Sequence, residues 1–367
     1  MQRIGTHQLY VGIIMFILGN TPLYELGVKA RQNAPLAMLV GSAAGLLLAG
    51  MYLWLYRRAP EAGLTELYRL HFGMWLGSAI ALMHATEQGY EAMNQIWNYA
   101  DLTSLTLLGS APAWLIKLIA CLLSTYTVIK GVEVLFRVIE LLFPLTLASY
   151  LLIAAMLYLN KLPDWHLLMP FVGFDTIVRA AIPQIMVFPF GQIITFLAIW
   201  QFANETCKVT RTTLLAYMTV TVMLVYGNAV IMSVLGPQMS SGTFVPLLEV
   251  VQLIQLGGFI ERLDIIVTLL LFFGLYVKLS VLYMATVLLI QPVLRCSWKA
   301  CAWGVGGLLF AATFVERNYA VHIWNAVHIL MPYNFVFEMA IPAVMLVIGA
   351  RRVARKAAMN RTALQTK

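Results

Sequence analysis

Apolar and polar positions alternate along this chain in long blocks, and the apolar blocks set its architecture. A transmembrane helix needs about 20 mostly apolar residues, and ten blocks of that kind occur in the sequence. The pattern therefore predicts an all-α integral membrane protein with ten transmembrane helices. The eighth block is longer than a bilayer requires, so we expect its helix to tilt or to extend into the cytoplasm. The predicted spans cover about residues 8–28, 35–56, 72–98, 113–129, 138–159, 177–203, 212–236, 260–292, 299–315 and 333–350.

Glycine and proline interrupt two of these blocks, the first and the sixth. Proline removes a backbone donor, and glycine weakens a helix. Because a bilayer offers no water to freed backbone groups, an unwound segment is tolerated only where it lines a cavity or is buried in protein. Each break is therefore either part of a binding site or a simple kink, and their paired positions favour a binding site. The breaks are Gly19-Asn20-Thr21-Pro22 and Phe188-Pro189-Phe190-Gly191.

The two breaks occupy matching positions in two halves of five spans each. Halves with an odd number of spans have opposite orientations, as in inverted-repeat transporters. We expect one transporter-fold domain over residues 1–367, with repeats at about 8–159 and 177–350 and a basic tail at 351–367. This arrangement resembles the five-plus-five fold of LeuT-like transporters in the amino acid–polyamine–organocation superfamily. That resemblance implies a substrate site between the broken first and sixth helices.

The distribution of charge places both chain termini in the cytoplasm. If the ten spans are correct, about two thirds of the 24 Lys and Arg residues fall on the side that holds the N-terminus, as the positive-inside rule predicts. The net charge of +8 reflects this bias. It gives no reason to expect nucleic acid as a partner.

Composition supports the membrane assignment and excludes several classes of function. Apolar residues make up 61% of the chain and charged residues 11%, with a mean hydropathy of +0.82. The four cysteines are scattered and form neither a disulfide framework nor a metal-binding spacing. The sequence has no Walker loop, zinc spacing, nucleophile elbow or dinucleotide fingerprint. We therefore expect no enzyme activity, no cofactor and no metal site.

Lys278 is an ionisable residue inside the eighth predicted span. A charge within the membrane is costly, so its side chain is expected to face the interior of the helix bundle. In sodium-coupled members of the superfamily the first and eighth spans form a cation site, and by that resemblance Lys278 would replace the ion or carry a proton. The alternatives are a static pair with a buried glutamate, or a side chain that snorkels to the interface.

The third span carries two carboxylates four residues apart, at Glu87 and Glu91, which share one face of a helix. Tyr90 lies beside Glu91. In this fold the third span lines the substrate site, so we expect Glu91 and Tyr90 to contact ligand and Glu87 to serve as a proton site. The alternative is that all three residues lie at the outer end of the span, exposed to water.

Short motifs along almost the whole chain are more specific than the fold. They are Tyr56-Arg57-Arg58-Ala59-Pro60, Leu64-Thr65-Glu66-Leu67, Gly73-Met74-Trp75-Leu76-Gly77, Lys130-Gly131-Val132-Glu133-Val134, Phe143-Pro144, Leu168-Met169-Pro170, Phe188-Pro189-Phe190-Gly191, Val234-Leu235-Gly236-Pro237, Pro246-Leu247-Leu248-Glu249 and Phe259-Ile260-Glu261-Arg262-Leu263. In their order and spacing these motifs resemble the endospore germination permease family, the GerAB-type B subunits of nutrient germinant receptors. The chain departs from the family at Gln192, where relatives commonly carry Glu, and at 20–22, where relatives often carry small apolar residues.

The family resemblance implies a membrane subunit of a spore germinant receptor that binds a small nutrient, an amino acid, and triggers germination. It also implies an A subunit and a lipoprotein C subunit as partners, in the inner spore membrane. Two other functions stay open: proton-coupled amino acid transport, and a water or ion conduit opened during germination. The expected ligand contacts are Gly19, Asn20, Thr21, Tyr90, Glu91, Phe188, Pro189, Phe190 and Gly191, and the expected proton or cation-surrogate residues are Lys278 and Glu87.

Overall fold

The computed structural model describes residues 3–349, apart from 108, 244, 255–263 and 317–318. The described residues form helices and their connections, and a single bridge between Ile4 and Ala203 is the only β-pairing among them. The all-α prediction is therefore confirmed. The family motif at 259–263 and the basic tail at 351–367 lie outside the described residues.

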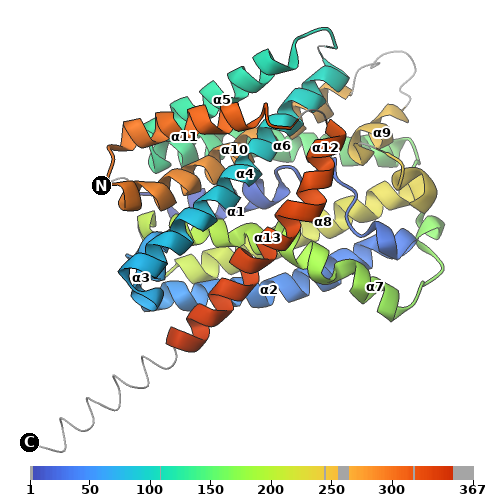
Figure 1. The fold of residues 1–367 in the computed structure, drawn as a ribbon. Coiled ribbons are helices and arrows are strands. Elements are labelled where there is room, and N and C mark those ends of the chain that lie inside the picture. Colours follow the sequence, from blue (N-terminus) through green and yellow to red (C-terminus); the bar gives the residue numbers. More distant parts are fainter. Residues whose placement is uncertain (1–2, 108, 244, 255–263, 317–318, 350–367) are drawn as a thin grey trace, which may run out of the picture.

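The helices pack side by side in one bundle, with α3 and the N-terminus at one end and α9 and α12 toward the other (Figure 1). The α-helices are α1 Thr6–Leu18, α2 Ala34–Arg58, α3 Leu64–Phe72, α4 Met74–Thr106, α5 Ala113–Lys130, α6 Val132–Leu159, α7 Phe174–Ala180, α8 Val209–Ser240, α9 Pro246–Gln252, α10 Asp264–Leu294, α11 Trp298–Ala312, α12 Tyr319–Asn325 and α13 Met331–Phe335. The 3₁₀-helical segments are η1 Thr21–Leu23, η2 Val28–Asn33, η3 Trp165–Leu168, η5 Gly191–Ala198 and η6 Trp200–Phe202. The π-helical segments are η4 Ala181–Phe190, η7 Ala326–Leu330 and η8 Val336–Ala340.

Within the described part of the chain, seven helical segments are long and apolar enough to cross a membrane. The three other predicted spans correspond to α1, α4 and α11. Helices α1 and α11 have 13 and 15 residues, and α4 has 33 residues but carries many polar side chains along its length. The count of ten spans and the repeat boundaries stay predictions. The seven segments are Val28–Arg58, Ala113–Lys130, Val132–Leu159, Phe174–Ala198, Val209–Ser240, Asp264–Leu294 and His328–Gly349.

Both predicted helix breaks are confirmed. Helix α1 ends at Leu18, and the chain continues through the short turn η1. In the sixth span, Phe188 has φ −112° and ψ 121°, which are extended rather than helical dihedrals. Helical backbone resumes at Gly191, where η5 begins.

The first break is held against α10 by a contact between two glycines. A Cβ atom on Gly274 would lie 2.2 Å from the carbonyl oxygen of Gly19, and a Cβ on Gly19 would lie 2.9 Å from the carbonyl oxygen of Gly274. Only glycine allows the two backbones to approach so closely. This contact brings the next turn of α10, which carries Lys278, beside the break.

The buried core surrounds α10, which packs chiefly against α4. Helices α6, α8 and α11 instead direct large apolar side chains outward. Leu151, Val222 and Leu308 are each more than 60% exposed in the isolated chain. An apolar outer surface around a partly polar interior is the arrangement expected of a bundle surrounded by lipid.

Candidate functional site

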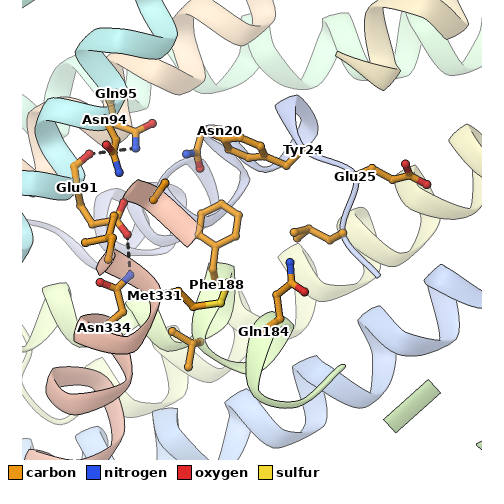
Figure 2. Close-up of a pocket in the computed structure, with 14 residues that line it drawn as sticks. Asn20, Tyr24, Glu25, Glu91, Asn94, Gln95, Gln184, Phe188, Met331 and Asn334 are labelled. Atoms are coloured by element: carbon orange, nitrogen blue, oxygen red, sulfur yellow. Dashed lines mark hydrogen bonds between the residues drawn. The ribbon is translucent and has the colours of Figure 1, made fainter. Parts of the chain in front are cut away.

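A cavity of roughly 230 Å³ lies between the two helix breaks. Figure 2 shows that its wall is built from four separate parts of the chain: the first break, α4, the sixth span and the last helical segment, which runs from α12 through η7 and α13 to η8. A site assembled in this way changes shape when any of these elements moves. Its lining residues are Asn20, Tyr24, Glu25, Leu26, Glu91, Asn94, Gln95, Gln184, Val187, Phe188, Ala326, Leu330, Met331 and Asn334.

One wall of the cavity is rich in hydrogen-bond acceptors. The Glu91 carboxylate accepts a hydrogen bond of 2.7 Å from the Asn334 amide (Figure 2). The side-chain oxygens of Asn94 and Asn334 are buried and have no hydrogen-bond partner among the described residues. Buried polar atoms normally have partners. A carboxylate beside two unpartnered amide oxygens suits a ligand that brings several N–H donors.

An apolar cluster lines another part of the cavity, next to the polar side chains of Gln184 and Glu25. The ring of Phe188 meets the ring of Tyr24 edge to face, with 5.7 Å between centroids. Val187, Leu330 and Met331 complete this cluster. The cavity therefore suits a small molecule with a polar end and an apolar end.

Lys278 lies behind the cavity, between the two breaks. Its side chain is fully buried, and Nζ donates a hydrogen bond of 2.7 Å to Oδ1 of Asn20 in the first break. Nζ also lies 4.6 Å from the ring centroid of Phe188 in the second break, a cation–π distance. No carboxylate of the described residues lies within 4.0 Å of Nζ, so the predicted alternative of a direct static ion pair is not found. The alternative of snorkelling is wrong, because the ammonium group is buried.

Glu87 and Glu91 lie in the interior, and the alternative that they are exposed at an outer end is wrong. Their exposed fractions are 0% and 5%. Helix α4 extends to Thr106, well past the predicted end at 98, which leaves both carboxyls near its middle. Only Glu91 lines the cavity.

Three of the predicted ligand contacts, Asn20, Glu91 and Phe188, line this cavity, and the other six do not. The Tyr90 hydroxyl donates to Glu316 instead, at 2.5 Å. Thr21 donates to the carbonyl oxygen of Ile17, and a Cβ on Gly191 would lie 2.2 Å from a carboxylate oxygen of Glu338. Gly19 packs against α10, Phe190 packs against Tyr217, and Pro189 is buried beside it.

Several cavity residues were missed from sequence. Asn94 and Gln95 follow Glu91 by three and four residues, so helical spacing alone places them on its face. Asn334 and Met331 come from the last helical segment, far away in sequence, and no local pattern marks them. Glu338, one helical turn after Asn334, is an ionisable residue of the tenth predicted span and does not line the cavity; it is fully buried behind the second break.

A polar cluster fastens the last helical segment to α4 next to the cavity. Glu316, in the connection between α11 and α12, accepts hydrogen bonds from Tyr90 and from Asn325, and its other oxygen lies 2.6 Å from Nδ1 of His322. Burial by itself raises the pKa of Glu316, but the hydrogen bonds from His322, Asn325 and Tyr90 outweigh it and lower that pKa to about 2. The Glu316 carboxylate is therefore ionised and tightly held.

Comparison with known proteins gives consistent matches. A family model described as spore germination protein matches residues 3–320. Spore germination protein KB of Bacillus subtilis (strain 168) is 26% identical over 363 residues, which cover 96% of each chain. Spore germination protein YndE of the same organism is 23% identical over 158 residues, 42% of this chain and 44% of YndE.

Among solved structures, MhsT in complex with L-phenylalanine has a TM-score of 0.67 with 15% sequence identity, covering 95% of this chain and 88% of MhsT. At that identity the likeness shows the fold alone. The fold is that of the LeuT-like transporters, as the paired breaks predict, and the chain is a multi-pass membrane protein.

Proposed function

The chain belongs to the spore germination protein family, and from this premise we propose that it is the membrane subunit of a germinant receptor. In this proposal it binds a small nutrient, an amino acid, in the cavity between its broken helices, and binding triggers germination. The observation that carries the proposal is the acceptor-rich wall at Glu91, Asn94 and Asn334, in a cavity that an apolar cluster around Phe188 also lines.

An amino acid matches the acceptor-rich wall and the apolar cluster. Its ammonium group would donate to Glu91 and to the unpartnered oxygens of Asn94 and Asn334. Its side chain would pack against Phe188 and the apolar residues beside it. A structure of this fold with L-phenylalanine bound supports an amino acid as the ligand class.

Lys278 orients the side-chain amide of Asn20 so that its Nδ2 can donate to the ligand's carboxylate. Its ammonium group holds Oδ1 of Asn20, so the Nδ2 donors of the same amide are directed elsewhere. Asn20 lines the cavity, and we assign Nδ2 to the carboxylate of the bound amino acid. Lys278 then acts as a fixed cation that orients the first break, where relatives of the fold use a metal ion.

Binding would signal by joining elements that otherwise move separately. A ligand shifts a conformational equilibrium only by its different affinity for the two states. A molecule bonded to the first break, α4 and the last helical segment at once favours the state in which they are close together. By family membership, this state would be passed to an A subunit and a lipoprotein C subunit in the inner spore membrane, with both termini of this chain in the cytoplasm.

Proton-coupled amino acid transport is the second candidate, and the buried ionisable groups Glu87 and Lys278 near the cavity favour it. Vesicles that contain this chain alone would then accumulate substrate when a pH gradient is imposed. Flux that neither saturates nor needs a gradient would instead indicate the water or ion conduit. A receptor that only senses its ligand gives neither result.

The test is binding of a panel of amino acids and nucleosides to the purified chain, measured by thermal shift and then by calorimetry. We expect saturable binding of one amino acid and, in Glu91→Gln, a loss of affinity of about tenfold or more, because a hydrogen bond to a charged group contributes about 1.5–3 kcal/mol. Glu66→Gln, at an exposed position on α3, is the matched control and should bind normally. Equal affinity in Glu91→Gln and wild type would place the ligand elsewhere.

A further inference from the structure

A row of ionisable side chains continues behind the cavity from Glu91, and its other members are not used by the proposed ligand contacts. His84, Glu87 and Glu91 occur at spacings of three and four residues on one face of α4. His84 and Glu87 are both 0% exposed. Burial this deep in a membrane bundle is rare for ionisable groups unless they have a function.

Hydrogen bonds link the side chains of this row. The Tyr68 hydroxyl lies 2.7 Å from Nδ1 of His84, and the Gln88 amide nitrogen lies 3.3 Å from Nε2 of the same ring. The Gln88 amide donates to Oε2 of Glu87 at 2.9 Å, and Thr195 donates to the Gln88 oxygen, which sets the orientation of that amide. Nε2 of His84 also lies 3.3 Å from Oε2 of Glu87. Oε2 of Glu87 therefore has a donor and an imidazole beside it.

Three carboxylate oxygens next to this row have no hydrogen bond. Oε1 of Glu87 and both oxygens of Glu338 are buried and unpartnered among the described residues. Glu338 is 0% exposed, and its carboxyl occupies the space left by Gly191 at the second helix break. Phe337, the neighbour of Glu338, stacks on His84 with 4.9 Å between centroids. Glu87 and Glu338 therefore have carboxylate oxygens without partners in the same buried region.

The formal charges of this region do not balance. Glu87, Glu91 and Glu338 oppose a single cation, Lys278, if His84 is neutral. An ionised carboxylate with neither a cation nor donors around it is strongly disfavoured in a protein interior. The described residues contain no group of three or more His, Cys, Asp or Glu that converges to hold a metal ion. The titratable groups facing the region are Tyr52 from α2, Tyr68 from α3, His84, Glu87 and Glu91 from α4, Lys278 from α10 and Glu338 from η8.

We propose that Glu87 and Glu338 form a proton-binding pair, in which Glu338 is a neutral carboxylic acid at neutral pH and the free oxygens of the two carboxyls share the proton. With Glu338 protonated, Glu91 and Lys278 balance each other in charge, and Glu87 keeps its donor Gln88 and the imidazole of His84 beside it. The inference extends the proposed function and rests on it in one respect. The ammonium group of an amino acid at Glu91 would favour ionisation of the pair, so that ligand binding would release a proton to the solvent.

The test is infrared spectroscopy of the whole chain in lipid nanodiscs, without any ligand. We expect an absorption band of a protonated carboxylic acid at neutral pH, lost in Glu338→Gln and shifted in Glu87→Gln, because each change removes one member of the pair. Glu66→Gln, at an exposed position, should leave the band unchanged. Since glutamine resembles the neutral acid in shape and charge, Glu338→Gln should melt at the same temperature as wild type.

Two results would overturn the pair. One is the absence of a protonated-acid band in folded wild type. The other is a wild-type chain stabilised by sodium or potassium ions in a Glu338-dependent way, which would mean that ionised carboxylates hold a cation. If Glu338→Gln does not fold, the presence of the band in wild type and its shift in Glu87→Gln still test the pair. Because no ligand is used, the outcome is independent of whether an amino acid binds in the cavity.

Discussion

Lys278 contacts the first break through its hydrogen bond to Asn20 and the second through the ring of Phe188, and we expect it to orient the site. Lys278→Met keeps the length of the side chain and removes the charge. No carboxylate of the described residues lies within 4.0 Å of Nζ, so the change removes one hydrogen bond and no direct ion pair. We therefore expect normal accumulation of folded protein but weaker ligand binding, by about tenfold or more, since Asn20 is no longer held.

The comparison requires a lysine that plays no part in the site. Lys299→Met, at an exposed position at the start of α11, serves as the control in both expression and binding assays. A Lys278→Met protein that fails to accumulate while Lys299→Met is normal would show that Lys278 is needed for folding rather than for binding.

Glu316 allows a prediction of pH dependence. Its pKa is about 2 in the fold, against an ordinary value of 4.5. A lowered pKa stabilises the folded state above pH 4.5, and that contribution disappears as the pH falls from 4.5 toward 2. Melting temperatures of wild type and Glu316→Gln should therefore differ at neutral pH and converge in acid. A difference that stays constant over this range would mean that the carboxylate is not stabilised by its hydrogen bonds.

At the scale of elements, the contact between the first break and α10 depends on two glycines. Gly274→Ala places a methyl group 2.2 Å from the backbone of Gly19, and overpacking of this kind costs about 1–3 kcal/mol. Gly307→Ala, on α11, meets no atom within 4 Å and serves as the matched control. Thermal unfolding in detergent should show a clear loss of stability for the first variant only. Equal melting temperatures would mean that α10 is not held at the break.

The positions of the two helix breaks could be predicted from sequence. Which residues near the breaks face the cavity, and which face other helices, could not. Glycine and proline indicate where backbone leaves a helix, so residues 19–22 and 188–191 identified both breaks. Gly191 was expected to meet ligand, yet it meets the carboxyl of Glu338. That contact comes from a helix about 150 residues away in sequence, and no local spacing encodes it. Tyr90, next to Glu91, turns toward Glu316 because adjacent residues on a helix point in different directions.

At the scale of the whole molecule, family and fold follow from sequence more readily than the site does. Ordered motifs along the chain indicate the family because many weak matches combine. The cavity depends on which side chains the packing brings together. Asn334 and Met331 show this, since they enter the cavity only because the last helical segment packs against the sixth span and α4. The fold alone also serves several functions, so it does not choose between receptor, transporter and conduit.

A dose–response measurement on spores tests most directly whether a nutrient bound between the broken helices triggers germination. Spores whose receptor carries this chain as wild type, Glu91→Gln or Glu66→Gln would be exposed to increasing concentrations of the amino acid selected by the binding panel. We expect Glu91→Gln to need at least about tenfold more nutrient for half-maximal germination, with Glu66→Gln unchanged. The same half-maximal concentration in Glu91→Gln and wild type, at equal receptor levels, would contradict the proposed function.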